Sequence, residues 1–267
     1  MKVSGVRASP RVVAASKCGD SRWTHCVNGR RRTCARSPGP DWEDLEDGVF
    51  QIRSEVAYEE TFLLLDEVMN TLPLAGAPVI ALPNRGVLLG ADSSDAQAVR
   101  ALIARARQFL QHAAWPLSGT LLIRNAEGWV RFEAPPNLAA GAQALEKLSL
   151  ALTYQEQQAV LQKVAERIGD PLYVATFGLL APKEDPDARV SWCSWAEGVV
   201  SLLPVTDQIG LTKAVQTPQS ETLMRPWALI ERVCGSRMTK TDEDPPRYRV
   251  ESFPSAEEWQ QLKLASE

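Results

Sequence analysis

The stretch A-P-V-I-A-L-P-N-R-G-V-L-L-G (residues 77–90) decides the fold of this chain. Its first six residues are apolar and partly β-branched, which predicts a strand over 77–82, and residues 87–90 predict the strand that pairs with it. The four residues P-N-R-G between the two strands are typical of a turn. The sequence therefore predicts a β-hairpin, against which the following segments are expected to pack.

A helix and a second hairpin follow the first one. Apolar residues recur at helical spacing over 99–113, and Ser94 with Gln97 fits a capping box ahead of that helix. Pro116 prevents the helix from continuing. Residues 120–133 contain two short strands joined by N-A-E-G, which predicts the second hairpin. We expect both hairpins to form one antiparallel sheet with the helix packed on one face.

Together these segments resemble the C-terminal half of the YtpQ-type family of bacterial proteins. The resemblance is carried by V-I-A-L-P-N-R-G-V-L-L-G-A-D (79–92), by S-G-T-L-L-I-R-N-A-E-G-W-V (118–130) and by an apolar helix expected at 58–72. It covers residues 57–133, and Asp92 matches the family's trailing aspartate. Gly86 stands where the family pattern has an acidic residue, so no role of that carboxylate carries over. The resemblance implies a fold and no particular reaction.

The rest of the chain predicts further helices and short strands. Residues 49–53 are expected to form an edge strand, and residues 137–169 a pair of helices, the second starting at a Thr153–Glu156 capping box. After them we expect a strand, a hairpin, a helix after a proline, another strand, and a last helix capped by Ser255 and Glu258. These elements are expected over residues 172–180, 190–203, 226–235, 247–253 and 255–262.

The predicted fold class is therefore α+β. We expect two small antiparallel-sheet units, residues 42–136 and 170–267, with helices packed on their faces and bridged by the helical pair at 137–169. Residues 1–41 are rich in Arg, Ser, Pro and Gly without sustained periodicity, which predicts a disordered basic leader. Translation from a wrongly assigned upstream start would also explain such a leader.

Charge is distributed unevenly along the chain. Residues 1–40 hold nine Lys and Arg against Asp20 alone, a net charge of +8. The remaining 20 basic and 32 acidic residues give residues 41–267 a net charge of −12. An acidic body argues against nucleic acid as its partner. No run of 18 apolar residues is present, so we expect no membrane span and predict a cytoplasmic protein.

Cysteine and histidine provide little support for metal or nucleophilic chemistry. Cys18, His25, Cys26 and Cys34 lie in the leader, but spacings of eight residues between the cysteines do not fit a tight zinc knuckle. We therefore expect no metal and no cofactor. In W-C-S-W (192–195), strand alternation would place Cys193 on one face together with Trp195. We expect a buried, inert thiol there.

The remaining polar candidates are Asp207, Glu221 and Arg225. Asp207 follows a predicted strand, where a carboxylate can act, and Glu221 and Arg225 could converge on it. Turn capping and surface ion pairing explain the same residues without a function.

The sequence favours a binding function over an enzymatic one. It contains only two histidines and lacks the phosphate-binding, dinucleotide-binding, serine-nucleophile and zinc-protease motifs. We predict a cytoplasmic, non-catalytic module that interacts with another protein, in an oligomeric state that the sequence does not predict. The alternatives are an enzyme of unknown reaction with a site in the second unit, and a toxin-neutralising immunity protein whose acidic body faces a basic partner.

Overall fold

The computed structural model describes residues 39–55, 58–112, 114–180, 187–213 and 220–265 of the chain. The predicted disorder of the leader concerns residues that lie almost wholly outside these ranges. Asp41, which the prediction included in the leader, already belongs to strand β1. Residues 40–267 form one compact unit, so the division into two independently folding units stays a prediction.

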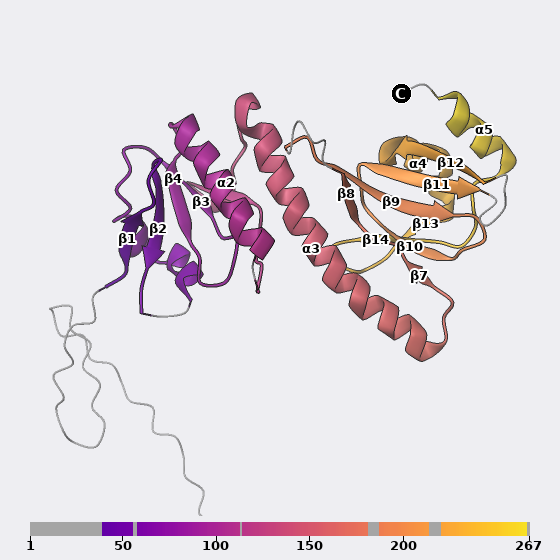
Figure 1. Cartoon of the computed structure of the whole chain (residues 1–267), viewed down its shortest axis with the longest axis horizontal. Coiled ribbons are helices and arrows are strands. Elements are labelled where there is room, and N and C mark those ends of the chain that lie inside the picture. The colour runs from indigo at the N-terminus through magenta and orange to yellow at the C-terminus, as the bar shows by residue number, and fades with distance from the viewer. Residues whose placement is uncertain (1–38, 56–57, 113, 181–186, 214–219, 266–267) are drawn as a thin grey trace, which may run out of the picture. The chain divides into compact units, whose positions relative to one another are not determined.

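The two predicted hairpins lie in one six-stranded antiparallel sheet (Figure 1). The strand order is β1-β2-β4-β3-β5-β6, and β3 pairs with both β4 and β5. The predicted single sheet is thereby confirmed. Residues 49–53 form an interior strand and not an edge strand, because β1 pairs with its outer side. The strands are β1 (Asp41–Asp44), β2 (Val49–Arg53), β3 (Pro78–Ala81), β4 (Leu89–Asp92), β5 (Leu121–Asn125) and β6 (Gly128–Arg131).

Both faces of this sheet are covered. Helix α2 (Ala96–His112) packs on one face through Val99, Leu102 and other fully buried side chains, as predicted. The opposite face carries the 3₁₀-helix η1 (Glu59–Leu64) and the one-turn helix α1 (Asp66–Met69). The cap of α2 is Asp95, whose carboxylate accepts the backbone N–H groups of residues 97 and 98; the Ser94 capping box was wrong by one residue.

The helix predicted over residues 58–72 is interrupted. Leu65 adopts an extended conformation (φ −107°, ψ 101°) between η1 and α1, which ends one helix before the next begins. Met69 and Leu72 are buried as the predicted apolar stripe requires, but Tyr58 and Leu65 are exposed. The break therefore leaves Tyr58 and Leu65 in solvent, whereas Phe62 between them remains partly buried.

One helix, α3 (Pro136–Ile168), replaces the predicted helical pair. At 33 residues it is about 50 Å long. The Thr153 hydroxyl donates to the carbonyl of Ser149 within the helix, 3.2 Å away, instead of capping a new helix. The helix ends at Gly169, whose left-handed φ of 71° suits glycine, as the sequence predicts.

The second half of the chain builds two four-stranded mixed sheets (Figure 1). Their orders are β13-β14-β10-β7 and β12-β11-β9-β8, and the pairs β7–β10 and β9–β11 are parallel. The α+β class is confirmed, and these two sheets are mixed where antiparallel sheets were predicted. The strands are β7 (Tyr173–Val174), β8 (Gly178–Leu180), β9 (Val190–Ala196), β10 (Ser201–Pro204), β11 (Gln208–Lys213), β12 (Glu221–Pro226), β13 (Met238–Lys240) and β14 (Arg247–Val250).

Two strand predictions fail because the chain passes from one sheet to the other. The strand expected over 172–180 is divided into β7 and β8, since Phe177 turns inward and stacks on Tyr154 with ring centroids 5.0 Å apart. The expected hairpin over 190–203 does not form, because β9 and β10 belong to different sheets. Gly198 (φ 76°) occupies the turn between them.

Helices complete the second half, and their ends follow the sequence signals. Pro226 precedes α4 (Trp227–Cys234), which continues into η2 (Gly235–Arg237). In α5 (Ala256–Leu264) both hydrogen bonds of the predicted Ser255–Glu258 capping box are present. Among the described residues, no helix is both long and apolar enough to span a bilayer.

A buried arginine connects α3 to the second pair of sheets. Arg247 on β14 is fully buried and donates to Gln157 Oε1 (2.5 Å) and to the carbonyls of residues 154, 175 and 202. The Tyr154 hydroxyl donates in turn to the carbonyl of Pro246, 2.7 Å away. Burial lowers the pKa of Arg247 to about 10, which leaves the guanidinium charged at neutral pH. These contacts fix the C-terminal half of α3. Its N-terminal half is fixed by Leu138 and Leu145, which are buried in the core between α2 and the six-stranded sheet.

Candidate functional site

The three predicted polar residues do not converge on one site. The Asp207 carboxylate accepts hydrogen bonds from Lys147 Nζ (2.7 Å) on α3 and from both the backbone N–H and the hydroxyl of Ser191 (2.6 and 2.8 Å). Glu221 forms an ion pair with Lys263 (2.6 Å) at the end of α5. Arg225 donates to the carbonyl of Leu262 (2.7 Å) in the same helix. The structure therefore brings Glu221 and Arg225 to α5, and it does not bring them to Asp207.

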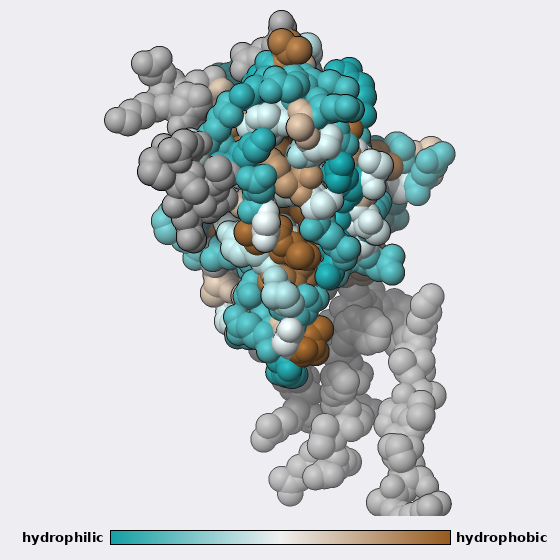
Figure 2. Space-filling model, turned by 90° about the vertical axis from the view of Figure 1, so that its right-hand side faces the viewer, coloured by the Kyte–Doolittle hydropathy of each residue, from teal (hydrophilic) through white to brown (hydrophobic). Residues whose placement is uncertain are grey.

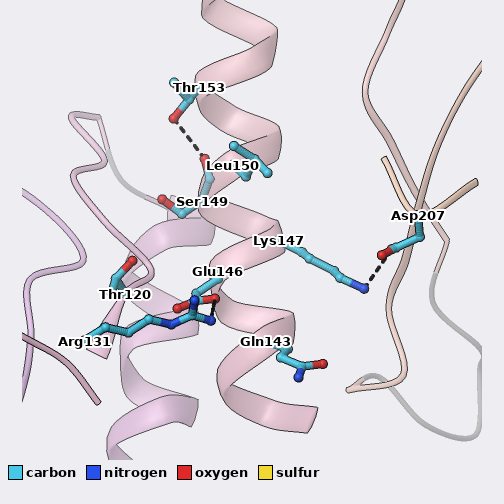
Figure 3. Close-up of a pocket in the computed structure, with 9 residues that line it drawn as sticks. All are labelled: Thr120, Arg131, Gln143, Glu146, Lys147, Ser149, Leu150, Thr153 and Asp207. Carbon is cyan, nitrogen blue, oxygen red and sulfur yellow. Dashed lines mark hydrogen bonds and ion pairs between the residues drawn. The ribbon is translucent and has the colours of Figure 1, made fainter. Parts of the chain in front are cut away.

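Asp207 contributes to an open pocket along α3 with a volume of about 560 Å³ (Figure 3). The pocket is lined mostly by polar side chains from α3, with one residue each from β6, from the segment before β5 and from the segment before β11. They are Thr120, Arg131, Gln143, Glu146, Lys147, Ser149, Leu150, Thr153 and Asp207.

Two ion pairs account for the charged groups of this pocket, and they point apart. Arg131 bonds Glu146 at 2.6 Å on one side of α3, whereas Lys147 extends towards Asp207 on the other side (Figure 3). Catalysis needs charged groups that converge on one reacting atom. These four groups neutralise each other in pairs and leave no such point of convergence.

The two carboxylates of the pocket have opposite pKa shifts. Burial raises the pKa of Asp207, but the hydrogen bonds from Lys147 and Ser191 outweigh it and hold that pKa below its ordinary value. Burial is also the largest effect on Glu146, and there it prevails over the attraction of Arg131, so the pKa of Glu146 is raised. The difference arises because Asp207 accepts three hydrogen bonds, while the Arg131 partner of Glu146 is mostly exposed.

Ser191 and Cys193 are not activated nucleophiles. The Ser191 hydroxyl donates to the Asp207 carboxylate and accepts the Asp207 backbone N–H, so both its hydrogen-bonding roles serve the turn. Cys193 is fully buried on the same strand face as Trp195, as the sequence predicts. Burial raises the pKa of its thiol to about 12, so it carries no thiolate at neutral pH.

A different kind of site surrounds the turn of the first hairpin. The turn at residues 83–86 lies beside the segment that follows α2: the Arg85 N–H donates to the Trp115 carbonyl (3.1 Å), and the Leu117 N–H donates to the Pro83 carbonyl (3.0 Å). Gly86 has a left-handed φ of 74°, which favours glycine, and its N–H donates to Glu60 of η1 at 2.7 Å. Three segments that are distant in sequence thus meet at this turn.

Four side chains of these segments are exposed and form what we call the turn surface: Tyr58, Arg85, Trp115 and Leu117. Trp115 is 66% exposed and Tyr58 is 51% exposed. Trp115 is the only exposed tryptophan among the seven that the structure describes. The Arg85 guanidinium lies over the Tyr58 ring, with its carbon 4.6 Å from the ring centre. Large aromatic groups at the surface beside an arginine are typical of binding sites.

Other exposed apolar side chains of the described residues lack this grouping. Val160, Val164 and Ile168 recur every four residues and form a narrow exposed aliphatic stripe on α3, with Lys163, Glu166 and Arg167 between them in sequence. Figure 2 shows the side of the molecule with the second pair of sheets, where hydrophilic side chains surround a few small hydrophobic patches. A narrow aliphatic stripe without an aromatic ring is a weaker indication of a binding site than the turn surface.

Sequence reasoning missed every residue of the turn surface. The helical pattern over 58–72 assigned Tyr58 to a buried stripe, and Arg85 was considered only as part of a turn. Trp115 and Leu117 flank Pro116, just after the expected end of a helix. A tryptophan next to a proline in a short connection was the available signal, because such a segment has little room to bury it.

Comparison with known proteins adds no assignment. No protein-family model, no curated protein and no solved structure matches the chain. In the described parts of the chain, no three His, Cys, Asp or Glu side chains gather where they could hold a metal ion. The leader residues considered for zinc, Cys18, His25, Cys26 and Cys34, lie outside those parts.

Proposed function

We propose that this protein is a non-catalytic interaction module that binds another protein through the turn surface. The observation that carries the proposal is the exposure of Trp115 beside the stacked pair of Tyr58 and Arg85. Tryptophan, tyrosine and arginine are the residues that contribute most to binding energy at protein interfaces. Covering a tryptophan that is two-thirds exposed removes enough apolar area to contribute roughly 3 kcal/mol to binding.

The rigidity of the turn surface supports the proposal. The backbone of residues 83–86 is bonded to two other segments, and the mostly buried strands β3 and β4 precede and follow the turn. Side chains held on such a base lose little conformational entropy when a partner binds. The turn surface therefore resembles a preformed interaction site.

The pocket along α3 gives weaker support to an enzymatic function. Its charged groups are paired and point apart, and Glu221 and Arg225 bind α5. An immunity protein would be one kind of protein-binding module, in which the acidic body faces a basic partner. The resemblance to the YtpQ-type family and the cytoplasmic location are part of the proposal as predictions from the sequence.

Site-specific photo-crosslinking in the cells from which the gene derives tests the proposal. A benzophenone amino acid replaces Trp115 in one variant and Ile168, which is 69% exposed on α3, in a matched control. We expect one discrete crosslinked protein from position 115 and none from position 168. Adding Tyr58→Ala should reduce the yield at position 115. Equal products at both positions, or no product at position 115, would refute the proposed interaction surface.

A further inference from the structure

We infer that the partner segment bound at the turn surface presents a carboxylate side chain next to apolar side chains. This inference rests on the proposed function and adds the chemistry of the partner. It follows from the unpaired charge of Arg85, which needs a negatively charged partner when the neighbouring aromatic groups are covered.

Arg85 is exposed and has no carboxylate oxygen within 4.0 Å among the described residues. The two acidic residues that follow Tyr58 already have hydrogen-bond partners: Glu60 accepts the Gly86 N–H, and Glu59 accepts the hydroxyl of Ser54. By contrast, Arg124 on β5 forms an ion pair with Asp66 at 2.6 Å. The turn surface thus contains an arginine whose charge this chain does not pair.

Stacking on Tyr58 prepares Arg85 to bind a carboxylate. A guanidinium that lies over an aromatic ring keeps its N–H groups at the edge of the plane free to donate. Such an edge matches the two oxygens of a carboxylate and can form two parallel hydrogen bonds. Because the ring already limits the motion of the side chain, less entropy is lost on pairing.

The aromatic neighbours determine which partner binds well. Arg85 is joined to Trp115 by a backbone hydrogen bond, so a partner that covers Trp115 and Leu117 with apolar side chains would also reach Arg85 and displace water from it. A desolvated arginine without an acidic partner is unfavourable, and a partner lysine at that position would add repulsion. An Asp or Glu beside the apolar contact compensates for the lost hydration. The net charge of −12 on residues 41–267 does not reverse this preference, since charges beyond about 8 Å are largely screened at physiological salt.

Selection from a library of random short peptides displayed on phage, with the full chain as the target, tests the inference. We expect the selected peptides to be enriched in Asp or Glu next to aromatic or aliphatic residues. Binding of a selected peptide should weaken about tenfold or more in Arg85→Glu, and less in Arg85→Lys, which keeps the charge but loses the planar edge. Arg100→Glu provides the control, because Arg100 is exposed on α2 and undergoes the same change of charge.

Trp115→Ala distinguishes a failure of the proposed interaction surface from a failure of the inferred carboxylate. If peptides depend on Trp115 but lack acidic enrichment, or bind Arg85→Glu as well as the wild type, the inferred carboxylate is wrong and the interaction surface stands. If selected peptides bind Trp115→Ala unchanged, or if none is enriched over an unrelated target protein, the proposed surface is wrong and the inference fails with it. Enrichment in Lys and Arg would instead favour the basic partner of an immunity protein.

Discussion

The turn surface and the pocket along α3 differ in how their polar and apolar groups are satisfied. In the pocket, Lys147 pairs with Asp207 and Arg131 pairs with Glu146, so the charged groups bind one another. At the turn surface, Trp115 and Tyr58 remain in water and Arg85 has no acidic partner among the described residues. The charged groups of the pocket are thus paired within the chain, whereas those of the turn surface would be paired and covered only by the partner that we propose. Side chains of the pocket are expected to affect stability, and side chains of the turn surface to affect binding.

A substitution in the core beneath both regions should have the largest effect on stability. Leu102 is fully buried in the cluster that also contains Val87, just after the turn, and Leu145, between pocket residues. Leu102→Ala should lower the free energy of unfolding by about 2–5 kcal/mol, because it removes buried apolar area and leaves a cavity. Urea denaturation measures this change, with Ile168→Ala as the exposed control. An unchanged midpoint would show that α2 does not pack through this side chain.

Substitution of Asp207 should have the next largest effect on stability. Asp207→Asn removes the charge that binds Lys147 and leaves Ser191, a buried residue, with a poorer acceptor. We expect a loss near the lower end of about 1.5–3 kcal/mol, the range for hydrogen bonds to charged groups, because the side chain is partly exposed. The aspartate stabilises the folded state above the ordinary aspartate pKa of about 3.9, because its folded-state pKa is lower.

The pH dependence of Asp207→Asn gives a second measurement. The difference in stability between the wild type and the variant should be complete near neutral pH and should shrink as the pH falls through the folded-state pKa of Asp207. Thermal unfolding at several pH values measures it. A difference that stays constant down to low pH would mean that Asp207 acts through packing and not through its charge.

Local signals in the sequence predicted the first half of the fold better than the second. The hairpin at 77–90 pairs neighbouring strands, so its turn residues and alternation specify it. In the second half, β9 pairs with β8 and β11, and β10 pairs with β7 and β14. Such pairing is decided by the core shared by the two sheets, in which Trp195 and Leu203 from β9 and β10 meet. The sequence also did not predict that α3 is continuous. Thr153 and Glu156 match a capping box, but a threonine can equally lie inside a helix and bond the carbonyl four residues earlier.

The candidate site was less predictable than the fold. Asp207, Glu221 and Arg225 are polar residues at strand ends, and the sequence could not show that Asp207 binds α3 while Glu221 and Arg225 bind α5. The exposure of Tyr58 depends on the break at Leu65, which no proline or glycine announces. The stack of Arg85 on Tyr58 joins residues 27 positions apart, so it needs the folded sheet to exist.

Glu146 should show a smaller effect with the opposite dependence on pH. Its pKa is raised by burial, so ionised Glu146 weakens the folded state, and its contribution is favourable only at low pH and is lost as the pH rises through its folded-state pKa. Glu146→Gln removes this cost together with an ion pair to the exposed Arg131, which contributes about 0–1 kcal/mol. We expect a net change within about 1 kcal/mol at neutral pH. As the pH falls, the wild type should gain stability relative to this variant, the reverse of the Asp207→Asn comparison. Equal pH profiles for both variants would refute the contrast between the two carboxylates.

Trp115 should have the smallest effect on stability and so give the sharpest contrast with the pocket. Trp115→Ala changes a side chain that is 66% exposed, and the backbone carbonyl that accepts the Arg85 N–H is retained. Surface substitutions of this kind change the free energy of unfolding by about 0.5 kcal/mol or less. Tyr58→Ala should cost somewhat more, up to about 1 kcal/mol, because it also removes the stacked arginine contact. Urea denaturation of these two variants and of Asp207→Asn shows which substitution lowers the free energy of unfolding most. A loss for Trp115→Ala as large as that for Asp207→Asn would mean that this tryptophan supports the fold, and the argument that its exposure marks a binding surface would then fail.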